Sequence, residues 1–245
     1  MISITEFFIP PSLGEQIRSA ERVAVLTGAG ISAESGLPTF RDSLTGLWAQ
    51  YRAEDLATPE AFRRDPKLVW EWYAWRRAAA LVALPNPGHL AIAEMERRVP
   101  CLRLITQNVD RLHQRAGSTH VIELHRSLEN ARCSREGTVV PWPESEEKLP
   151  RCLQCGAFLR PDIVWFGEML ASNVLEAAVE AAKGCEVFLV VGTSGVVQPA
   201  AGLAQIAEES GATVVVVNPD APANLRPSWI FIPGPAGEVL PALID

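Results

Sequence analysis

The fold is decided by residues 23–33, which read Val-Ala-Val-Leu-Thr-Gly-Ala-Gly-Ile-Ser-Ala. The first five residues form an apolar run of strand length, and Gly28 to Ala33 match the G-x-G-x-x-A form of a dinucleotide-binding loop. Glycines let the backbone approach a pyrophosphate, and the start of the following helix would offer N–H groups to it. Taken alone, this pattern is equally compatible with a tight strand-to-helix turn that binds nothing.

Further strand-sized segments occur along the chain, at residues 102–106, 188–191, 213–217 and 229–232. Helical patterns lie between them, at residues 173–182, with Ser172 as a plausible N-cap, and at 200–209. This alternation predicts an α/β fold with a doubly wound parallel sheet of the Rossmann-like type. Ligands of such sheets bind at the carboxyl ends of the strands. The residues that directly follow four of the predicted strands are Gly28, Gln107, Gly192 and Asn218.

Two stretches interrupt the alternation and predict a smaller module beside the sheet. Residues 42–98 are Trp-rich and helical in pattern, and residues 127–165 are polar and contain three of the five Cys. We therefore expect the Rossmann-like domain to comprise 1–41, 99–126 and 166–245. The helical insertion and a zinc-ribbon-like insertion would form the small domain.

Composition narrows the functional classes. The chain has 245 residues and a net charge of −7, with no basic run, which disfavours direct binding of nucleic acid. No apolar stretch is long enough to span a membrane, and the N-terminus lacks the pattern of a signal peptide. Five Cys, two of them in a Cys-x-x-Cys pair, favour a reducing, cytoplasmic location and metal binding over disulfides.

A plain dehydrogenase is disfavoured for a different reason. A hydride-transfer enzyme of this fold needs an acidic residue about 20 positions after the glycine loop, to bind the ribose. No such residue ends a second strand here.

Seven further motifs follow the glycine loop in a fixed order. They are Gly36-Leu37-Pro38-Thr39-Phe40-Arg41, Gln107-Asn108-Val109-Asp110, Glu123-Leu124-His125, Trp165-Phe166-Gly167-Glu168, Gly192-Thr193-Ser194, Asn218-Pro219 and Gly234-Pro235-Ala236-Gly237. Together with Gly28 to Ser32, this series resembles the signatures of the sirtuin (Sir2) family over residues ~20 to 240. The resemblance implies an NAD-dependent protein-lysine deacylase. Its products would be nicotinamide, O-acyl-ADP-ribose and free lysine.

The resemblance also implies roles for individual residues. His125 would be the general base, which suits an imidazole that titrates near neutral pH. Asn108 would be the second catalytic residue. Gln107, Asn108 and Asp110 would hold the nicotinamide carboxamide and its ribose. Residues implied to contact NAD are Gly28, Ala29, Gly30, Ser32, Phe40, Arg41, Gln107, Asn108, Val109, Asp110, Gly192, Thr193, Ser194, Asn218 and Ala236. We expect His89, His113 and His120 to be structural or solvent-facing.

The substrate side has two features. Phe166-Gly167-Glu168 and the stretch after Ser194 resemble the two edges between which the substrate peptide adds as a strand. Tyr73 and Arg76 lie three apart, so they share one helical face, and together they can bind a carboxylate. This pair is similar to that of the sirtuin subgroup that removes succinyl and malonyl groups. The alternative is a surface arginine that stacks on a tyrosine.

The sequence departs from the family pattern at two positions. Sirtuins usually hold zinc with two Cys-x-x-Cys pairs, but here Cys133 is followed three residues later by Glu136, while Cys152 and Cys155 are intact. Glu136 could be the fourth ligand, or the site could have lost its metal. Arg126 stands where the family usually has glycine after the histidine, which is costly if that backbone needs a positive φ.

Two other functions stay open at this point. A mono-ADP-ribosyltransferase would use the same NAD site but would not need Tyr73 and Arg76 as an acyl-carboxylate pocket. A non-catalytic NAD-binding sensor would need neither His125 nor Asn108.

Overall fold

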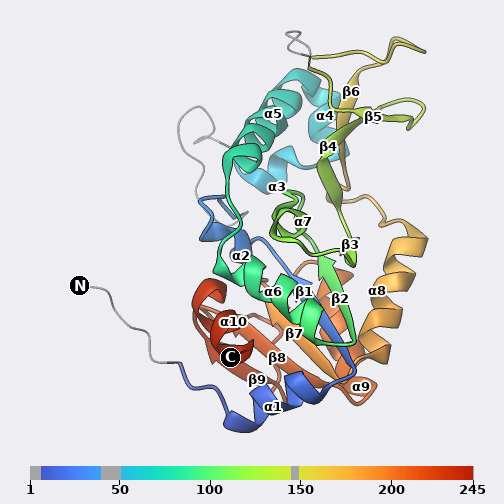
Figure 1. Cartoon of the computed structure of the whole chain (residues 1–245). Coiled ribbons are helices and arrows are strands. Elements are labelled where there is room, and N and C mark those ends of the chain that lie inside the picture. The colour runs from blue at the N-terminus through green and yellow to red at the C-terminus, as the bar shows by residue number, and fades with distance from the viewer. Residues whose placement is uncertain (1–6, 40–50, 145–148, 245) are drawn as a thin grey trace.

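The computed structural model of the chain describes residues 7–39, 51–144 and 149–244, and it consists of a large sheet domain with a smaller module at one end (Figure 1). All pairings in the large sheet are parallel, in the order β3-β2-β1-β7-β8-β9. Its strands are β1 (Arg22–Thr27), β2 (Cys101–Thr106), β3 (Val121–Glu123), β7 (Val187–Val191), β8 (Thr213–Asn218) and β9 (Ile230–Pro233). The doubly wound α/β fold expected from the sequence is confirmed.

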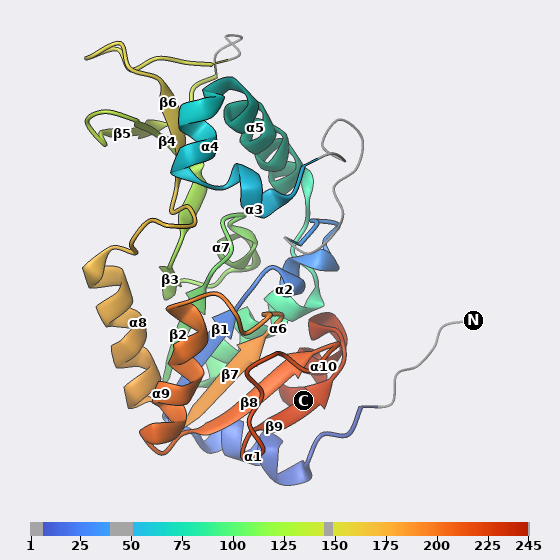
Figure 2. The same cartoon turned by 180° about the vertical axis from the view of Figure 1, so that it is seen from behind.

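Helices cover both faces of this sheet (Figures 1 and 2). One face is covered by α1 (Pro11–Ser19), α6 (Pro87–Arg98) and α10 (Ala236–Ile244). The other is covered by α8 (Ser172–Gly184) and by α9 (Leu203–Glu209), which continues a short 3-10 turn over Ala200–Gly202. Two short helices, α2 (Gly30–Ala33) and α7 (Leu112–Ala116), follow the carboxyl ends of β1 and β2.

Both faces of the central strands are buried, which explains why their sequences are continuously apolar. In β1, Val23 and Val25 pack with the α1, α6 and α10 side, whereas Ala24 and Leu26 pack with α8 and α9. The order in which strands are added to the sheet reverses at β1, because the chain proceeds from β1 through β2 to β3 on one side and from β7 through β8 to β9 on the other. The β1–β7 boundary is therefore the topological switch point at which ligands of such sheets bind.

The small module combines three helices with a three-stranded antiparallel sheet of order β5-β4-β6. Its elements are α3 (Ala53–Leu56), α4 (Pro59–Arg64), α5 (Pro66–Val82), β4 (Arg126–Cys133), β5 (Val139–Pro141) and β6 (Leu159–Ile163). Thr58 and Asp65 cap α4 and α5 with their side chains, and a proline follows each cap. Trp72, Tyr73 and Trp165 fill the core between α5 and β6.

The structure corrects two expectations about local structure. Helix α6 was expected in the helical insertion of residues 42–98, but Ala91, Ile92 and Met95 pack into the core of the large sheet. Ser172 is the first residue of α8 rather than its cap, since the capping position is Ala171. In the described part of the chain, no helix has the length and apolar character needed to cross a membrane.

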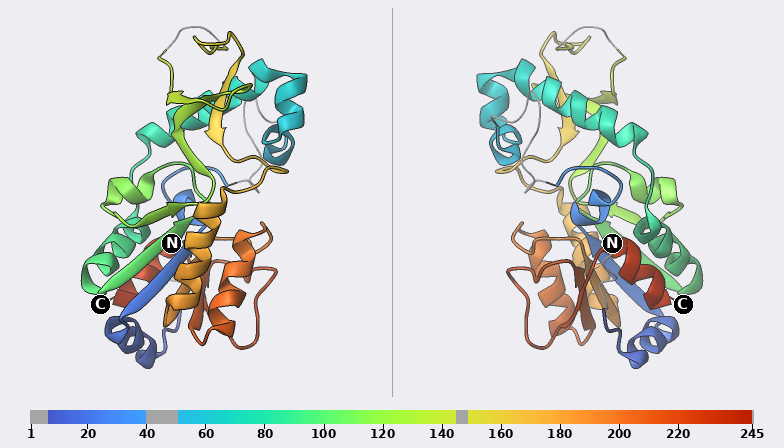
Figure 3. Two further views of the ribbon diagram at one scale, coloured as in Figure 1. Left: turned by 90° about the vertical axis from the view of Figure 1, so that its right-hand side faces the viewer. Right: turned by 90° about the vertical axis from the view of Figure 1, so that its left-hand side faces the viewer.

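The chain passes from β3 to β4 and later from β6 to α8, and these two connecting segments lie side by side (Figure 3). The chain leaves the large sheet after β3 and enters β4 within the turn that contains His125. It returns after β6 through residues 164–171 to α8. The N–H of Val164 donates to the carbonyl of His125 at 3.2 Å, so the two segments are joined at this residue.

Candidate active site

Two glycine loops meet at the carboxyl ends of β1 and β7. The N–H of Gly28 donates to Val191 O at 3.0 Å, and that of Gly30 donates to Gly192 O at 2.8 Å. A Cβ on Gly30 would lie 2.7 Å from Gly192 O, and one on Gly192, whose φ is +61°, would lie 2.3 Å from Ile31 N. Glycine is required here because the two backbones touch each other.

This contact changes the expected role of the loop. The N–H groups of Ile31 and Ser32 donate to Gly28 O and Ala29 O, so they are engaged within the loop, like that of Gly30. Helix α2 is one turn long, which leaves little helix dipole for a phosphate. The expectation that the start of a helix presents unused N–H groups at Gly30 to Ser32 is therefore wrong.

Ser32 joins three polar groups in a buried cluster. Its hydroxyl donates to Asp110 Oδ2 at 2.8 Å and accepts from Asn108 Nδ2 at 3.1 Å. Asn108 Nδ2 also donates to Gly28 O at 3.0 Å, and its backbone N–H donates to Thr106 Oγ1 at 3.0 Å. These bonds fix the Asn108 side chain at the end of β2, next to the glycine loop.

His89 completes this cluster from α6. The Asn86 N–H donates to His89 Nδ1 at 3.3 Å, so the ring proton is on Nε2, which lies 3.4 Å from the Ser32 hydroxyl. Burial lowers the pKa of His89 to about 4, so the ring is neutral. The sequence predicts that His89 is structural or solvent-facing, and the structure shows it buried. Its contact with Ser32 depends on packing between distant segments.

A second buried histidine supports the same strand ends. Thr27 Oγ1 donates to Thr106 Oγ1 at 2.8 Å and lies 2.9 Å from His113 Nε2. Burial lowers the pKa of His113 well below its usual value, and the ring packs 4.8 Å from that of His89. The Thr106 hydroxyl, which accepts from the Asn108 N–H, is thus held by a series of hydrogen bonds that runs through Thr27 to His113. His120, by contrast, lies at the surface beside Glu96, as expected.

His125 lies beside the Gln107–Asp110 segment. Its Nδ1 is 2.9 Å from the carbonyl oxygen of Gln107, and because a carbonyl only accepts, Nδ1 has the proton. The other ring nitrogen, Nε2, is then the one with a lone pair. Burial lowers the pKa of His125 below its usual 6.5, which favours the neutral ring that a base requires. Gln107 Nε2 also donates to Thr193 Oγ1 at 3.2 Å.

Asp110 and Arg76 interact electrostatically across the two modules. Burial raises the pKa of Asp110, although the Leu112 N–H, the Ser32 hydroxyl and the Arg76 charge each oppose the rise. Burial lowers the pKa of Arg76, and the electrostatic interactions of Arg76 with Tyr73 and Asp110 oppose this decrease. The structure therefore brings the Tyr73–Arg76 side of α5 toward Asp110.

Tyr73 is almost fully buried, and its ring contacts Trp72 edge-on at a centroid distance of 4.6 Å. Arg76 lies one turn further along α5, with its guanidinium carbon 5.2 Å from the centroid of the Trp72 ring. Arg77 points elsewhere, since it donates to Leu128 O at 3.1 Å and lies over Trp142. The adjacent arginines thus have separate surroundings.

The Phe166–Glu168 segment is a turn held by Arg160. Both Glu168 carboxylate oxygens accept from Arg160, at 2.6 and 2.8 Å, and one also accepts from Trp165 N–H at 2.9 Å. Burial alone would raise the pKa of Glu168, but these hydrogen bonds lower it. Gly167 has a φ of +84°, and Phe166 is exposed. The turn thus exposes the Phe166 side chain to solvent, whereas the Glu168 carboxylate is hydrogen-bonded to Arg160 and Trp165 within the small module.

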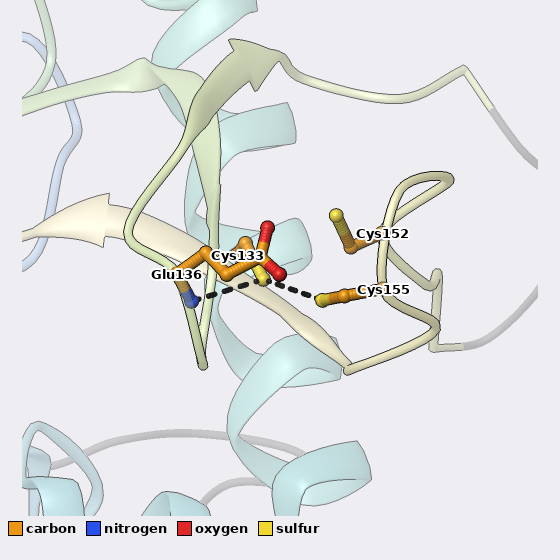
Figure 4. A group of neighbouring side chains, drawn as sticks. All are labelled: Cys133, Glu136, Cys152 and Cys155. Carbon is orange, nitrogen blue, oxygen red and sulfur yellow. Dashed lines mark hydrogen bonds between the residues drawn. The ribbon is translucent and has the colours of Figure 1, made fainter.

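Four potential metal ligands converge at the far end of the small module (Figure 4). Ligand atoms of Cys133, Glu136, Cys152 and Cys155 all lie within 4.8 Å of one another, and the Cys133 and Cys155 sulfurs are 3.4 Å apart. A tetrahedral zinc with Zn–S bonds of about 2.3 Å needs neighbouring sulfurs about 3.8 Å apart. Three thiols and one carboxylate at these separations fit a zinc ion.

The other residues expected to bind NAD are distributed along the same edge of the sheet. Thr193 is buried and Ser194 half-buried after β7, Asn218 ends β8, and Ala236 begins α10. Val109 packs against the small-module core. Phe40 and Arg41 lie outside the described residues.

Comparisons with known proteins place the chain in a family. Residues 28–199 match the model of the Sir2 family. The chain is 52% identical over 235 residues to NAD-dependent protein deacylase 2 of Pyrobaculum aerophilum, covering 96% of this chain and 94% of that one.

Two solved structures are also similar. A mutant Sir2 homologue in complex with 2′-O-acetyl ADP ribose has a TM-score of 0.90 and 46% identity, over 96% of this chain and 95% of that chain. A Sir2 complex with a p53 peptide and NAD+ has a TM-score of 0.87 and 30% identity, and the match covers 97% of this chain and 98% of that chain. With the family model matching residues 28–199 and a relative at 52% identity over nearly its whole length, the chain belongs to the Sir2 family.

Proposed function

We propose that this chain is an NAD-dependent protein-lysine deacylase that removes acetyl and especially succinyl and malonyl groups. The acyl oxygen of the modified lysine bonds to the ribose carbon that held nicotinamide, which leaves. A ribose hydroxyl then attacks the acyl carbon, and the uptake of one water molecule breaks the bond between the acyl carbon and the lysine nitrogen. The products are nicotinamide, O-acyl-ADP-ribose and lysine. The name of the Pyrobaculum relative and the ligands of the similar structures support this reaction class.

The position of His125 is the observation on which the proposal rests. Its Nδ1–H is held by the Gln107 carbonyl, which orients Nε2 as a proton acceptor. The same residue, Gln107, begins the segment that contains Asn108 and Asp110. A base at this position would lie next to the groups proposed to hold the nicotinamide ribose, as deprotonation of a ribose hydroxyl requires.

The cluster around Ser32 supports NAD as the co-substrate. Asn108 and Asp110 are both hydrogen-bonded to Ser32, so contacts within the protein hold an amide and a carboxylate side by side. The Asn108 carbonyl oxygen and the Asp110 carboxylate can accept hydrogen bonds from a carboxamide, while Gln107, Thr193 and Asn218 offer polar groups for riboses and phosphates. We assign Phe40 and Arg41 to the cofactor cover by family resemblance alone.

Tyr73 and Arg76 support the preference for acidic acyl groups. They lie on one face of α5, and a phenol with a guanidinium forms a binding pair for a carboxylate. Burial raises the pKa of Tyr73, so its hydroxyl stays protonated and can donate. The buried rings of Trp72 and Trp165 beside it would suit the methylene part of a succinyl chain.

The Phe166–Glu168 turn and the stretch after Ser194 would bind the substrate peptide as an added strand, mainly through backbone hydrogen bonds. Cys133, Glu136, Cys152 and Cys155 would hold a structural zinc ion, which would tie the loops of the small module together.

The test is a panel of acetyl-, malonyl- and succinyl-lysine peptides incubated with NAD and the purified chain. Mass spectrometry is expected to find nicotinamide, O-acyl-ADP-ribose and free lysine in equal amounts, with faster turnover of the acidic acyl groups. ADP-ribose attached to protein without loss of the acyl group would identify a transferase instead. NAD binding without turnover would identify a sensor.

A further inference from the structure

Arg126 is one of only two non-glycine residues with positive φ among the described residues, the other being Arg111. Each directly follows a residue of the candidate active site, namely His125 or Asp110. The left-handed region is unfavourable for an L-residue other than glycine, and such strain concentrates at functional sites. With a φ of 63°, Arg126 adopts the backbone conformation that glycine adopts most readily.

The surroundings of Arg126 hold this conformation in place. Its guanidinium Nη1 lies 2.6 Å from Asp162 Oδ1, and the Asp162 side chain is only 9% exposed. Arg132 lies 3.3 Å from the same oxygen, so the buried carboxylate joins two strands of the small sheet. A charge pair at this point anchors the residue that follows His125 to β6.

The anchor lies where the chain crosses between the two modules. Arg126 pairs with Ile163 at the first position of the β4–β6 ladder, and the register shifts between Arg126 and Ala131. Bulges of this kind re-aim side chains near active sites. The backbone carbonyl of His125 also accepts from Val164 N–H, at 3.2 Å. His125 thus lies in a turn whose direction is fixed from its C-terminal side.

We propose that Arg126, held by Asp162, is a positioning residue for His125, and this rests on the proposed role of His125 as the base. The ion pair stabilises a left-handed turn that would otherwise need glycine, and the turn directs the imidazole to the Gln107 carbonyl. Arg126 has no part in displacing nicotinamide. Its loss is therefore expected to impair the base-dependent step and to spare the first step.

Three variants separate conformation from charge. Arg126→Ala keeps the backbone restriction of an L-residue but loses the ion pair, so the turn is expected to relax toward negative φ. Arg126→Gly loses the ion pair but adopts the left-handed turn without strain. Arg126→Lys keeps a charge for Asp162. Arg103→Ala, which removes an exposed arginine from β2, is the control.

The first readout compares deacylation with exchange of labelled nicotinamide into NAD, which needs an acylated peptide but no base. Deacylation by Arg126→Ala is expected to fall about 10- to 100-fold, because small misplacements of a reacting group have effects of this size. Exchange by Arg126→Ala is expected to stay within about threefold of the parent chain. Deacylation by Arg126→Gly and by Arg126→Lys is likewise expected to stay within about threefold. Equal loss of both activities, or a glycine variant as poor as the alanine variant, would overturn the proposal.

The second readout needs no activity. NMR of ¹⁵N-histidine-labelled protein, with the His125 signals assigned by their absence in His125→Asn, reports whether Nδ1 has the ring proton. The Nδ1–H form is expected in the parent chain and in Arg126→Gly, and a mixture of tautomers in Arg126→Ala. An unchanged tautomer in Arg126→Ala would overturn the positioning role. A parent chain that shows the tautomer without deacylating would refute the proposed function instead.

Discussion

The Nδ1 of His125 lies 2.9 Å from the backbone carbonyl oxygen of Gln107, so the proposed base is oriented by the strand end that also presents Asn108. One peptide segment therefore sets both the tautomer of the imidazole and the place of the amide. Any shift of Gln107 would displace both groups together, so the proposed base and the proposed nicotinamide-binding amide would move as one.

Deacylation is expected to keep its rate to mildly acidic pH. Burial lowers the pKa of His125 below 6.5, so the neutral base persists as the pH falls until that lowered pKa is reached. The acid limb of kcat/KM for an acylated peptide should therefore lie below pH 6.5, while nicotinamide exchange should not share it. An acid limb centred above this value would contradict the assignment of His125.

Ser32→Ala is expected to weaken both steps of the reaction. The Ser32 hydroxyl joins Asp110 to Asn108, so its removal leaves both groups less firmly placed for NAD. We expect kcat/KM for NAD to fall about 10- to 100-fold, with exchange and deacylation reduced alike. Ser210→Ala, which removes an exposed hydroxyl bonded to Ile206 O, is the matched control. Unchanged kinetics in Ser32→Ala would contradict the role of the cluster.

Arg76→Met is expected to change acyl preference rather than overall activity. The guanidinium would bind the distal carboxylate of a succinyl group, an interaction that an acetyl group cannot make. Desuccinylation should fall about 100-fold, as expected for loss of a charge-assisted pair, with deacetylation within about threefold. Arg77→Met is the control, because Arg77 contacts Leu128 O and Trp142. Equal loss of the two activities would refute the acyl assignment.

The four-residue cluster of the small module is expected to bind about one zinc ion per chain. Elemental analysis of protein purified from zinc-supplemented cells measures this directly. Glu136→Ala should release the metal at a lower chelator concentration than the parent chain, and Glu136→Cys at a higher one, since thiolate binds zinc well. A folded, zinc-free parent chain would show that the cluster has lost its metal.

Acid is expected to destabilise the fold through its buried histidines. His89 has a pKa of about 4 when folded, against 6.5 as its usual value, so the unfolded chain binds more protons between these pH values. The stabilising contribution is complete above pH 6.5 and is lost as the pH falls toward 4, by up to about 3 kcal/mol for His89. Urea unfolding measured at several pH values in this range should show the loss of stability. The free energy of unfolding should change less steeply with pH in His89→Gln than in the parent chain. An identical pH dependence in the two chains would contradict burial of His89 as the cause.

The parallel sheet was predictable because its central strands are buried on both faces and so read as apolar runs. Gln107 and Gly192 were predictable site positions because they directly follow such strands. Helix α6 was misplaced, since its pattern does not indicate which module its apolar face covers. The contact of Gly30 with Gly192, the bond from His89 to Ser32 and the anchoring of Arg126 by Asp162 join segments distant in sequence, and no local pattern predicts such pairs.

The most direct test of base catalysis uses His125→Ala with NAD and an acetyl- or succinyl-lysine peptide. Without the imidazole, nicotinamide exchange is expected to continue, whereas formation of O-acyl-ADP-ribose and free lysine should fall by about 100-fold or more. A His125→Ala chain that deacylates as fast as the parent chain would contradict the role given to this residue.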